Sequence, residues 1–173
     1  MKCPFCGHHN IAGIDDCEDC GEDLTAFDGV RPVGRFEKSL VRDSLEILPG
    51  KAPVVVGPRT PLGEVAEHLA RENRSILVSE GGQLIGIVTE RDLLFKVLGK
   101  IPDWRQLPVS DFMTAEPESL EFSDKIAYAL HKMAIGGYRH LPLLKEGRPE
   151  RVVSVRDILE YLAEMFPAEA KIR

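Results

Sequence analysis

Two short stretches place a hydroxyl, an arginine and an aspartate at the same spacing. They are GIVTERDLL (86–94) and RVVSVRDIL (151–159), with candidate residues Thr89, Arg91, Asp92, Ser154, Arg156 and Asp157. A hydroxyl followed three residues later by an aspartate suits the first turn of a helix, where backbone N–H groups attract anions. A carboxylate there can also accept hydrogen bonds from a ligand. Either motif alone fits plain helix capping equally well, but its repetition favours a binding role.

The four cysteines form two C-x-x-C pairs near the N-terminus: Cys3, Cys6, Cys17 and Cys20. Gly7 and Gly21 follow the pairs and can take the positive φ that turns backbone amides towards thiolates. Two such turns predict a closed tetrahedral site, so we expect structural Zn²⁺ with no open position for catalytic water. Iron in the same site stays open, and two disulfides are the alternative that suits a secreted chain. His8 and His9 could replace a ligand, but with four cysteines available we interpret them as solvated loop residues.

Composition restricts the class of protein. The chain has 173 residues, of which 43% are hydrophobic and 29% charged, as in ordinary globular proteins. It contains no apolar run of ~18 residues and its N-terminus lacks the apolar core of a signal peptide, so we expect a cytoplasmic protein that does not span a membrane. The net charge is −6, and residues 1–25 carry −5 of it, which disfavours nucleic-acid binding by this segment.

The elements that must position the motifs are repeated with them. Residues 73–94 align without a gap on 138–159, and 56–70 align on 120–134. Each copy predicts a strand, a helix, two strands joined by a turn with glycine, and a final helix that begins at the hydroxyl residue. Such a copy is too small to be stable alone, so we expect the two to pack on each other.

Further predictions concern the helix starts, the second hairpin and the connecting segments. Thr60 and Ser123 are the expected helix starts. Pro149 predicts that the second hairpin is irregular or lies at a sheet edge. Trp104 and Phe112 are expected to cover an edge of the pair, and for Trp104 we favour packing over binding of a ligand. Residues 25–39 predict little structure, and residues 40–48 a short helix.

This arrangement resembles a tandem cystathionine-β-synthase (CBS) domain pair, or Bateman module, over roughly residues 44–166. The motifs that carry the resemblance are TPLGEVAEHL, GIVTERDLL, VSDFMTAEPESL, GYRHLPLL and VVSVRDIL. The segment CPFCGHHNIAGIDDCEDCGEDL resembles a rubredoxin-like zinc ribbon. The fold class implied is α+β: two β-α-β-β-α CBS repeats packed with pseudo-two-fold symmetry, plus a small N-terminal zinc ribbon with four cysteine ligands. The expected parts are a ribbon (1–25), a linker (26–43), a first repeat (44–100), a second linker (101–107), a second repeat (108–166) and a tail (167–173).

The resemblance implies a ligand. Family members bind adenosine-containing molecules (AMP, ADP, ATP or S-adenosylmethionine) in two clefts between the repeats. By this likeness Asp92 and Asp157 hold ribose hydroxyls, while Thr89 and Ser154 meet ribose or phosphate. Family pairs also stack into discs, which implies a homodimer formed through helices 62–72, 91–98, 125–134 and 156–166.

The second motif is richer in groups that bind phosphate. Arg139 and His140 precede its strand, where the family commonly binds phosphate, and arginine offers phosphate a bidentate fork. We therefore rank the group Arg139, His140, Ser154, Arg156 and Asp157 first. The group Ser75, Thr89, Arg91 and Asp92 ranks second. A surface ion pair at Arg139 and a satisfied, partly buried His140 are the alternatives.

The predicted function is regulation without catalysis. Nucleotide binding would change the packing of the repeats or of a dimer, and the ribbon would contact a protein partner. We find no catalytic cysteine loop, dinucleotide fingerprint or P-loop in the sequence. The alternatives are a nucleic-acid-associated zinc-ribbon regulator and a rubredoxin-like iron redox protein.

Overall fold

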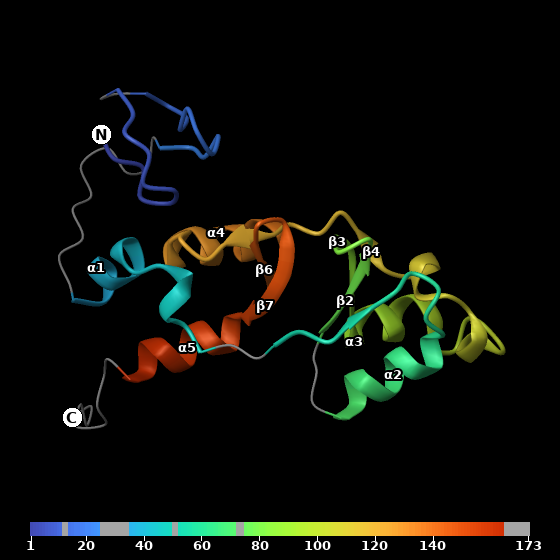
Figure 1. Ribbon diagram of the computed structural model, residues 1–173. Coiled ribbons are helices and arrows are strands. Elements are labelled where there is room, and N and C mark those ends of the chain that lie inside the picture. The colour runs from blue at the N-terminus through green and yellow to red at the C-terminus, as the bar shows by residue number, and fades with distance from the viewer. Residues whose placement is uncertain (12–13, 25–34, 50–51, 72–74, 165–173) are drawn as a thin grey trace. The chain divides into compact units, whose positions relative to one another are not determined.

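The computed structural model describes residues 1–11, 14–24, 35–49, 52–71 and 75–164. The predicted linker over residues 26–43 therefore lies partly outside the described residues, and the predicted tail (167–173) lies wholly outside them. The described chain is a mixed α/β protein with two sheets (Figure 1). Within it, we find no helix with the length and apolarity needed to cross a membrane.

The helices and strands follow the order of the sequence repeat. Before and within the first copy they are α1 (Arg35–Arg42), η2 (Leu45–Ile47), β1 (Val55–Val56), α2 (Leu62–Arg71), β2 (Ser75–Glu80), β3 (Gln83–Thr89), α3 (Glu90–Asp92) and η3 (Leu93–Val97). The connection and the second copy contain η4 (Trp104–Gln106), η5 (Val109–Asp111), β4 (Thr114–Ala115), β5 (Leu120–Glu121), α4 (Ile126–Gly136), β6 (His140–Lys145), β7 (Arg148–Ser154) and α5 (Val155–Glu164).

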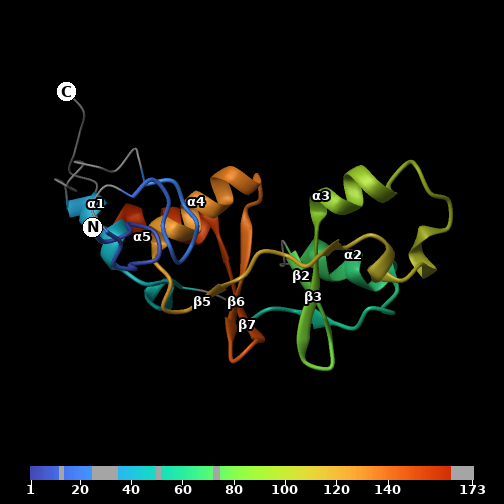
Figure 2. The same cartoon turned by 90° about the horizontal axis from the view of Figure 1, so that it is seen from above.

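The first sheet has the order β1-β2-β3-β4. β1 runs parallel to β2, whereas β2, β3 and β4 pair antiparallel. The β2–β3 hairpin, which Figure 2 shows from the side, turns at Gly81 and Gly82, which have φ of 60° and 85°. One face of α2 packs on this sheet because its apolar residues recur at helical spacing. The shared core contains Leu62, Val65, Leu69, Ile76, Val78 and Val88.

The second sheet has the order β5-β6-β7. β7 contains Pro149 and is an edge strand of this described sheet, as the missing N–H of proline predicts. The buried residues of β5, β6, β7, α4 and α5 include Leu120, Ile126, Ala129, Met133, Leu141, Leu143, Val153, Ile158 and Leu162. The spacing of those on α4 and α5 confirms the two predicted amphipathic helices.

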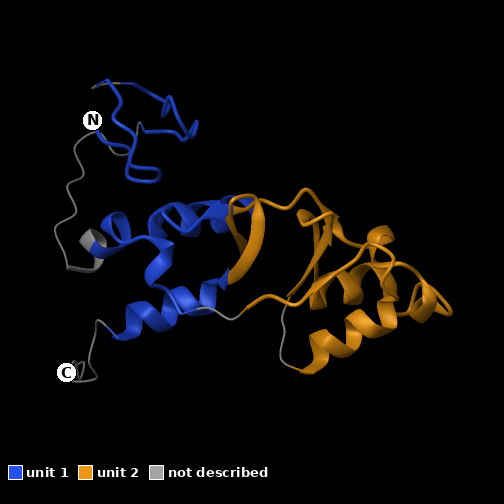
Figure 3. Cartoon of the chain, in the orientation of Figure 1, with its two compact units in different colours: residues 1–49, 120–141, 153–173 blue, residues 50–119, 142–152 orange. Residues whose placement is uncertain are grey.

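The chain forms two compact units that do not follow the sequence repeat (Figure 3). One unit contains residues 1–49, 120–141 and 153–173, and the other contains residues 50–119 and 142–152. One unit therefore combines most of the second copy with the lead-in segment of the first (43–49). The other combines the first copy with the lead-in segment of the second (107–115) and with residues 142–152 of the second hairpin. Residues 43–49 join the helix α4 of the second copy, while residues 107–115 join the first.

The exchange of lead-in segments is reciprocal at the level of single hydrogen bonds. Val109 N donates to Thr60 O (2.9 Å), and Leu45 N, 64 residues earlier, donates to Asp124 O (2.8 Å). In the same way Leu62 N donates to Leu107 O (2.9 Å), and Ile126 N donates to Asp43 O (3.1 Å). The lead-in backbone thus satisfies the first amides of α2 and α4, which have no partner within their own helices.

This backbone pairing corrects the predicted helix starts. Lys125, and not Ser123, precedes α4 as its cap residue, and it makes no side-chain cap bond. Thr60 N instead closes a turn with Gly57 O (3.1 Å), and the carbonyl of Pro61 accepts from Glu64 N. The prediction failed because a side-chain cap is unnecessary where another segment supplies backbone acceptors.

The connecting segments differ from prediction as well. Helix α1 begins at Arg35, inside the segment 25–39 for which little structure was expected, and residues 25–34 lie outside the described residues. The single helix predicted over 40–48 is wrong: α1 ends at Arg42 and a 3₁₀ turn follows at 45–47. Trp104 and Phe112 pack against the core of the first copy, which confirms packing for both side chains.

Candidate functional site

The first hydroxyl-x-x-Asp motif forms a capping box where β3 meets α3. Thr89 has extended backbone (φ −125°, ψ 167°), and its hydroxyl accepts from Asp92 N (3.4 Å). In return Asp92 Oδ2 accepts from Thr89 N (2.9 Å) and from the Thr89 hydroxyl (2.7 Å). The motif therefore satisfies two backbone amides at the start of the helix, those of Thr89 and Asp92, by itself.

The second motif forms the same box where β7 meets α5. Asp157 Oδ2 accepts from Ser154 N (2.7 Å) and from the Ser154 hydroxyl (2.6 Å), and Asp157 N donates to that hydroxyl (3.3 Å). The capping interpretation thus describes both motifs. Because each hydroxyl donates its hydrogen bond to the neighbouring carboxylate, neither Thr89 nor Ser154 has a donor left for phosphate in this arrangement.

Lys96 distinguishes the first box from the second. Its Nζ lies 2.7 Å from Asp92 Oδ1 and also donates to the carbonyl of Phe112 (2.9 Å). Burial raises the pKa of Asp92, but the hydrogen bonds from Lys96 and Thr89 outweigh it and hold that pKa below its usual value. Asp92 is therefore an ionised, largely covered carboxylate.

Tyr161 holds the position of Lys96 in the second copy. Its hydroxyl donates to Asp43 Oδ2 (2.6 Å) and lies 2.9 Å from the hydroxyl of Ser39, which also donates to Asp43. Burial and the adjacent Asp43 carboxylate raise the pKa of Tyr161, so the hydroxyl keeps its proton. Neither Lys96 nor Tyr161 was among the predicted site residues, although each stands one helical turn after its aspartate.

The arginines of the motifs contact their own helices. The guanidinium of Arg91 lies 5.6 Å from the centre of the Phe95 ring, and Arg156 Nε donates to Glu160 Oε1 (3.1 Å). Both are exposed pairs four residues apart, of a kind that contributes little to stability. Binding of phosphate by either side chain would require only the loss of such a weak contact.

The other predicted ligand residues lie close to the motifs in the backbone. Ser75 is buried and pairs with Thr89 across β2 and β3. The carbonyl of Arg139 accepts from Val155 N (3.1 Å), which joins the RHLP stretch to the start of α5. Arg139 is exposed and His140 is half-buried at the start of β6. The structure thus brings Ser75 to the first box and Arg139 to the second.

The four cysteines gather at one point. Their sulfur atoms all lie within 4.8 Å of one another, with 3.8 Å between Cys3 and Cys20 and 3.5 Å between Cys6 and Cys17. Tetrahedral Zn–S bonds of about 2.3 Å place sulfurs about 3.8 Å apart, whereas a disulfide needs about 2.05 Å. The cluster therefore fits a four-sulfur metal site and leaves all four cysteines without a disulfide.

Two equivalent turns build this cluster. Gly7 and Gly21 have φ of 81° and 69°, as predicted, and their amides donate to Cys3 O (3.0 Å) and Cys17 O (2.8 Å). His8 N points to Cys6 Sγ at 3.5 Å. The side chains of His8 and His9 are outside the cluster: both are exposed, and His8 lies 3.9 Å from Glu18, so their interpretation as loop residues is confirmed.

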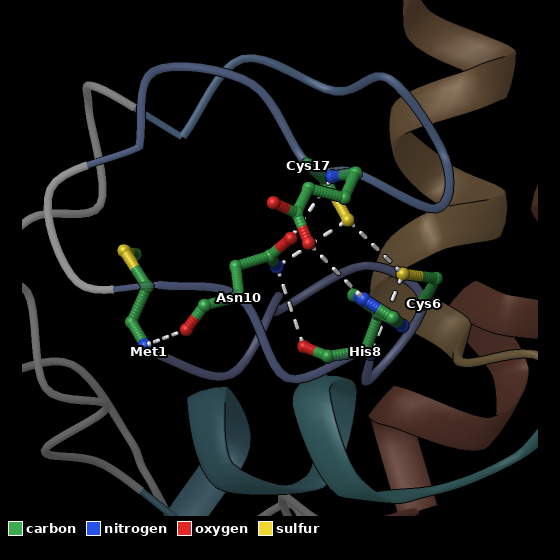
Figure 4. A network of polar contacts seen from close by, with 6 residues as sticks. Met1, Cys6, His8, Asn10 and Cys17 are labelled. Atoms are coloured by element: carbon green, nitrogen blue, oxygen red, sulfur yellow. Dashed lines mark hydrogen bonds and ion pairs between the residues drawn. The ribbon is translucent and has the colours of Figure 1, made fainter.

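Asn10 is a residue of this site that the sequence did not reveal (Figure 4). Its side-chain amide donates to Cys17 Sγ (3.4 Å) and to His8 O (3.4 Å), and its oxygen accepts from Glu18 N (2.9 Å). Burial raises the pKa of Cys17, but amides of Cys20, Asp19 and Asn10 outweigh it and lower that pKa to about 6. Burial raises the pKa of Cys20 to about 11. Asn10 thus favours the thiolate that a metal requires.

The cysteine segment contacts helix α4. The Glu22 carboxylate contacts the imidazole of His131 and forms an ion pair with Lys132 (3.5 Å), while the Phe5 ring lies 4.4 Å from the His131 ring. Tyr128 packs against the small core formed by Cys3, Phe5, Cys17 and Leu24. Glu22 stands in the second turn where His8 stands in the first, which gives this turn a specific contact with α4.

Comparison with known proteins identifies the repeated elements. The family model for the CBS domain matches residues 41–99 and 109–164. The CBS domain-containing protein CBSCBSPB5 of Arabidopsis thaliana is 36% identical over 112 residues, which make up 63% of this chain and 20% of that protein. The chain therefore spans about a fifth of the length of this plant relative.

Solved structures share the fold. The CBS-domain protein ATU1752 of Agrobacterium tumefaciens is 31% identical with a TM-score of 0.58, and the match covers 63% of this chain and 88% of that one. PAE2072 of Pyrobaculum aerophilum, a CBS domain protein solved in complex with AMP, has a TM-score of 0.61 at 23% identity. This second match covers 70% of this chain and 98% of the other, and at that identity it shows the fold alone.

Proposed function

Because the chain belongs to the CBS-domain family, we propose that it is a regulatory module that binds adenosine nucleotides of the AMP, ADP and ATP class at its hydroxyl-x-x-Asp motifs. The AMP complex of PAE2072 supports this class of ligand. The observation that carries the proposal is the repeated box in which one carboxylate oxygen caps the helix and leaves the other for a second partner.

The second motif supplies the principal contacts. Oδ1 of Asp157 accepts the ribose hydroxyls, and the start of the ten-residue helix α5 favours the phosphate. Arg139, Arg156 and His140 provide further donors for phosphate oxygens. The hydroxyl of Ser154 serves chiefly to hold Asp157, so it contributes to binding by positioning. In this proposal no residue acts as a catalyst, and the protein is not an enzyme.

Isothermal titration of the full chain with AMP, ADP, ATP and S-adenosylmethionine tests the proposal. We expect binding of at least one of these, and its loss in the double variant Asp92→Asn/Asp157→Asn. GMP is the matched ligand control, since it keeps ribose and phosphate but replaces adenine. Absence of heat with all four adenosine ligands at high protein concentration would contradict the proposal.

We propose that the cysteine cluster holds a structural Zn²⁺. Four thiolates at tetrahedral spacing support this metal, and a segment of this size needs such a ligand to fold. Elemental analysis is expected to give one zinc per chain, and Cys17→Ser to remove it. A red protein with stoichiometric iron would contradict the choice of zinc in favour of the redox alternative.

The output of the module is proposed to be a change in a homodimer or in a protein partner. Leu94, Phe95 and Leu98 around η3 and Leu159 on α5 are large exposed apolar side chains that a second copy would cover. The acidic, exposed Asp15, Asp16 and Asp19 offer a partner a charged surface on the cysteine segment. Light scattering should give a mass of two chains for the wild type and of one chain for Phe95→Glu.

A further inference from the structure

We propose that Lys96 makes the two motifs unequal, so that each chain binds one nucleotide, at the Asp157 motif, while Lys96 keeps the Asp92 motif closed to ribose. This inference rests on the proposed function, because it names which of two sequence-equivalent sites takes the ligand.

Asp92 has little hydrogen-bonding capacity left for a ligand. A carboxylate has about four lone-pair positions, two on each oxygen. The two donors from Thr89 fill Oδ2, and Lys96 takes a position on Oδ1 at 2.7 Å. About one position remains. A ribose cis-diol presents two hydroxyl donors, so it cannot be fully satisfied there.

Asp157 has more capacity. Ser154 fills its Oδ2 with the same two donors, but none of the described residues donates to Oδ1. Both positions on that oxygen are therefore available to a diol. Tyr161, which replaces Lys96 at this place, is engaged with Asp43 and Ser39 instead.

Two contacts keep Lys96 in place. The first is the ion pair with Asp92, four residues earlier in the chain. In addition, the carbonyl of Phe112 accepts from the ammonium at 2.9 Å, and Phe112 belongs to the exchanged lead-in segment. The side chain of Asp92 is only 14% exposed, which leaves a ligand little access unless Lys96 moves. Displacing a charge-assisted bond of this kind should weaken binding about tenfold or more.

The competing interpretation is that the Lys96 side chain changes its partner when nucleotide binds. In that case Lys96 would leave Asp92 when nucleotide arrives and bind its phosphate, so that its removal would weaken binding. The two interpretations predict opposite effects of the same substitution, which makes stoichiometry with AMP the decisive measurement.

The test titrates AMP into the full-length wild type and into Lys96→Met, with Lys96→Gln as a second variant in case the first folds poorly. We expect one AMP per wild-type chain and two per chain in either variant. Adding Asp92→Asn to Lys96→Met should return the value to one. Lys100→Met, which removes a nearby lysine that bonds to the carbonyl of Phe95, is the matched control and should stay at one.

The outcomes separate the two proposals. Two AMP per wild-type chain, or one per chain in both Lys96 variants, would overturn the role of Lys96 and leave the proposed function standing. Weaker binding in the Lys96 variants would overturn it in favour of a phosphate contact. Absence of AMP binding in the wild type and in every variant, together with absence of binding of the other adenosine ligands, would overturn both.

Discussion

The segments Thr89–Lys96 and Ser154–Tyr161 share three hydrogen bonds and differ at their last residue. In both, a hydroxyl and a carboxylate cap a helix in the same way. Only in the first segment does the side chain of the last residue, Lys96, form an ion pair with the capping carboxylate of Asp92. The comparison shows that the repeated pattern explains local folding in both copies, whereas a single unrepeated side chain decides how much of the carboxylate is left for a ligand.

The largest expected difference concerns nucleotide affinity. Asp157→Asn should weaken AMP binding on the order of 30-fold, about 2 kcal/mol, because a charged acceptor loses its bonds to the ribose. Asp92→Asn should change it less than about twofold. Calorimetry on the two matched variants measures both values. Equal losses would show that the two boxes bind alike and would remove the asymmetry.

The next difference concerns side-chain packing in the strand that leads into each capping box, β3 in the first copy and β7 in the second. A methyl group on Gly86 would overlap the Sδ of Met113, so Gly86→Ala should destabilise the chain by about 1–2 kcal/mol. The equivalent Arg151 in β7 is only partly buried, so Arg151→Ala should cost less than about 0.5 kcal/mol. Urea unfolding measures the two values. A neutral Gly86→Ala would mean that Met113 yields without strain.

A smaller effect is expected to be the same in both copies. Thr89→Ala and Ser154→Ala each remove a cap, and each should cost about 1 kcal/mol of unfolding free energy. Urea unfolding of both variants, with Ser110→Ala as a surface control, checks this equality. A cost at only one position would show that one box forms without contributing to the stability of its helix.

The smallest effect concerns protonation of Asp92. Its pKa lies below the usual value, so its ionised form stabilises the fold above the unfolded pKa of 3.8, and this contribution is lost as the pH falls through the lower folded pKa. Lys96→Met should raise the pKa of Asp92 and reduce the loss of stability between neutral pH and pH ~3. Carboxyl NMR titration checks the direction. An unchanged pKa would show that the ion pair contributes nothing.

The sequence predicted the parts of the fold that depend on local pattern. Apolar runs joined by a turn with glycine predicted both hairpins, and helical spacing predicted α2, α4 and α5. Paired cysteines followed by glycine gave the geometry of the four-sulfur cluster. Each of these depends on residues close together in the chain.

What the sequence missed depends on partners far away in it. The start of α4 is satisfied by backbone from Asp43, which no local cap signal at Ser123 indicates. Lys96 and Tyr161 are set by the carbonyl of Phe112 and the carboxylate of Asp43, both in exchanged segments. Apolar periodicity along the sequence contains no information on such contacts. Asn10 is a local exception, because its partner Cys17 is only seven residues away.

The reciprocal lead-in segments have a consequence for any attempt to produce the two copies separately. A gene fragment that stops within residues 101–107 would encode the first copy without β4 and without the carbonyl that anchors Lys96, while keeping residues 43–49, whose acceptors lie in the missing half. The complementary fragment would lack residues 43–49 and would keep the lead-in segment of the second copy, whose partners lie in the first copy. The smallest piece that can be expected to fold intact is therefore the whole tandem from Asp43 to the end of α5.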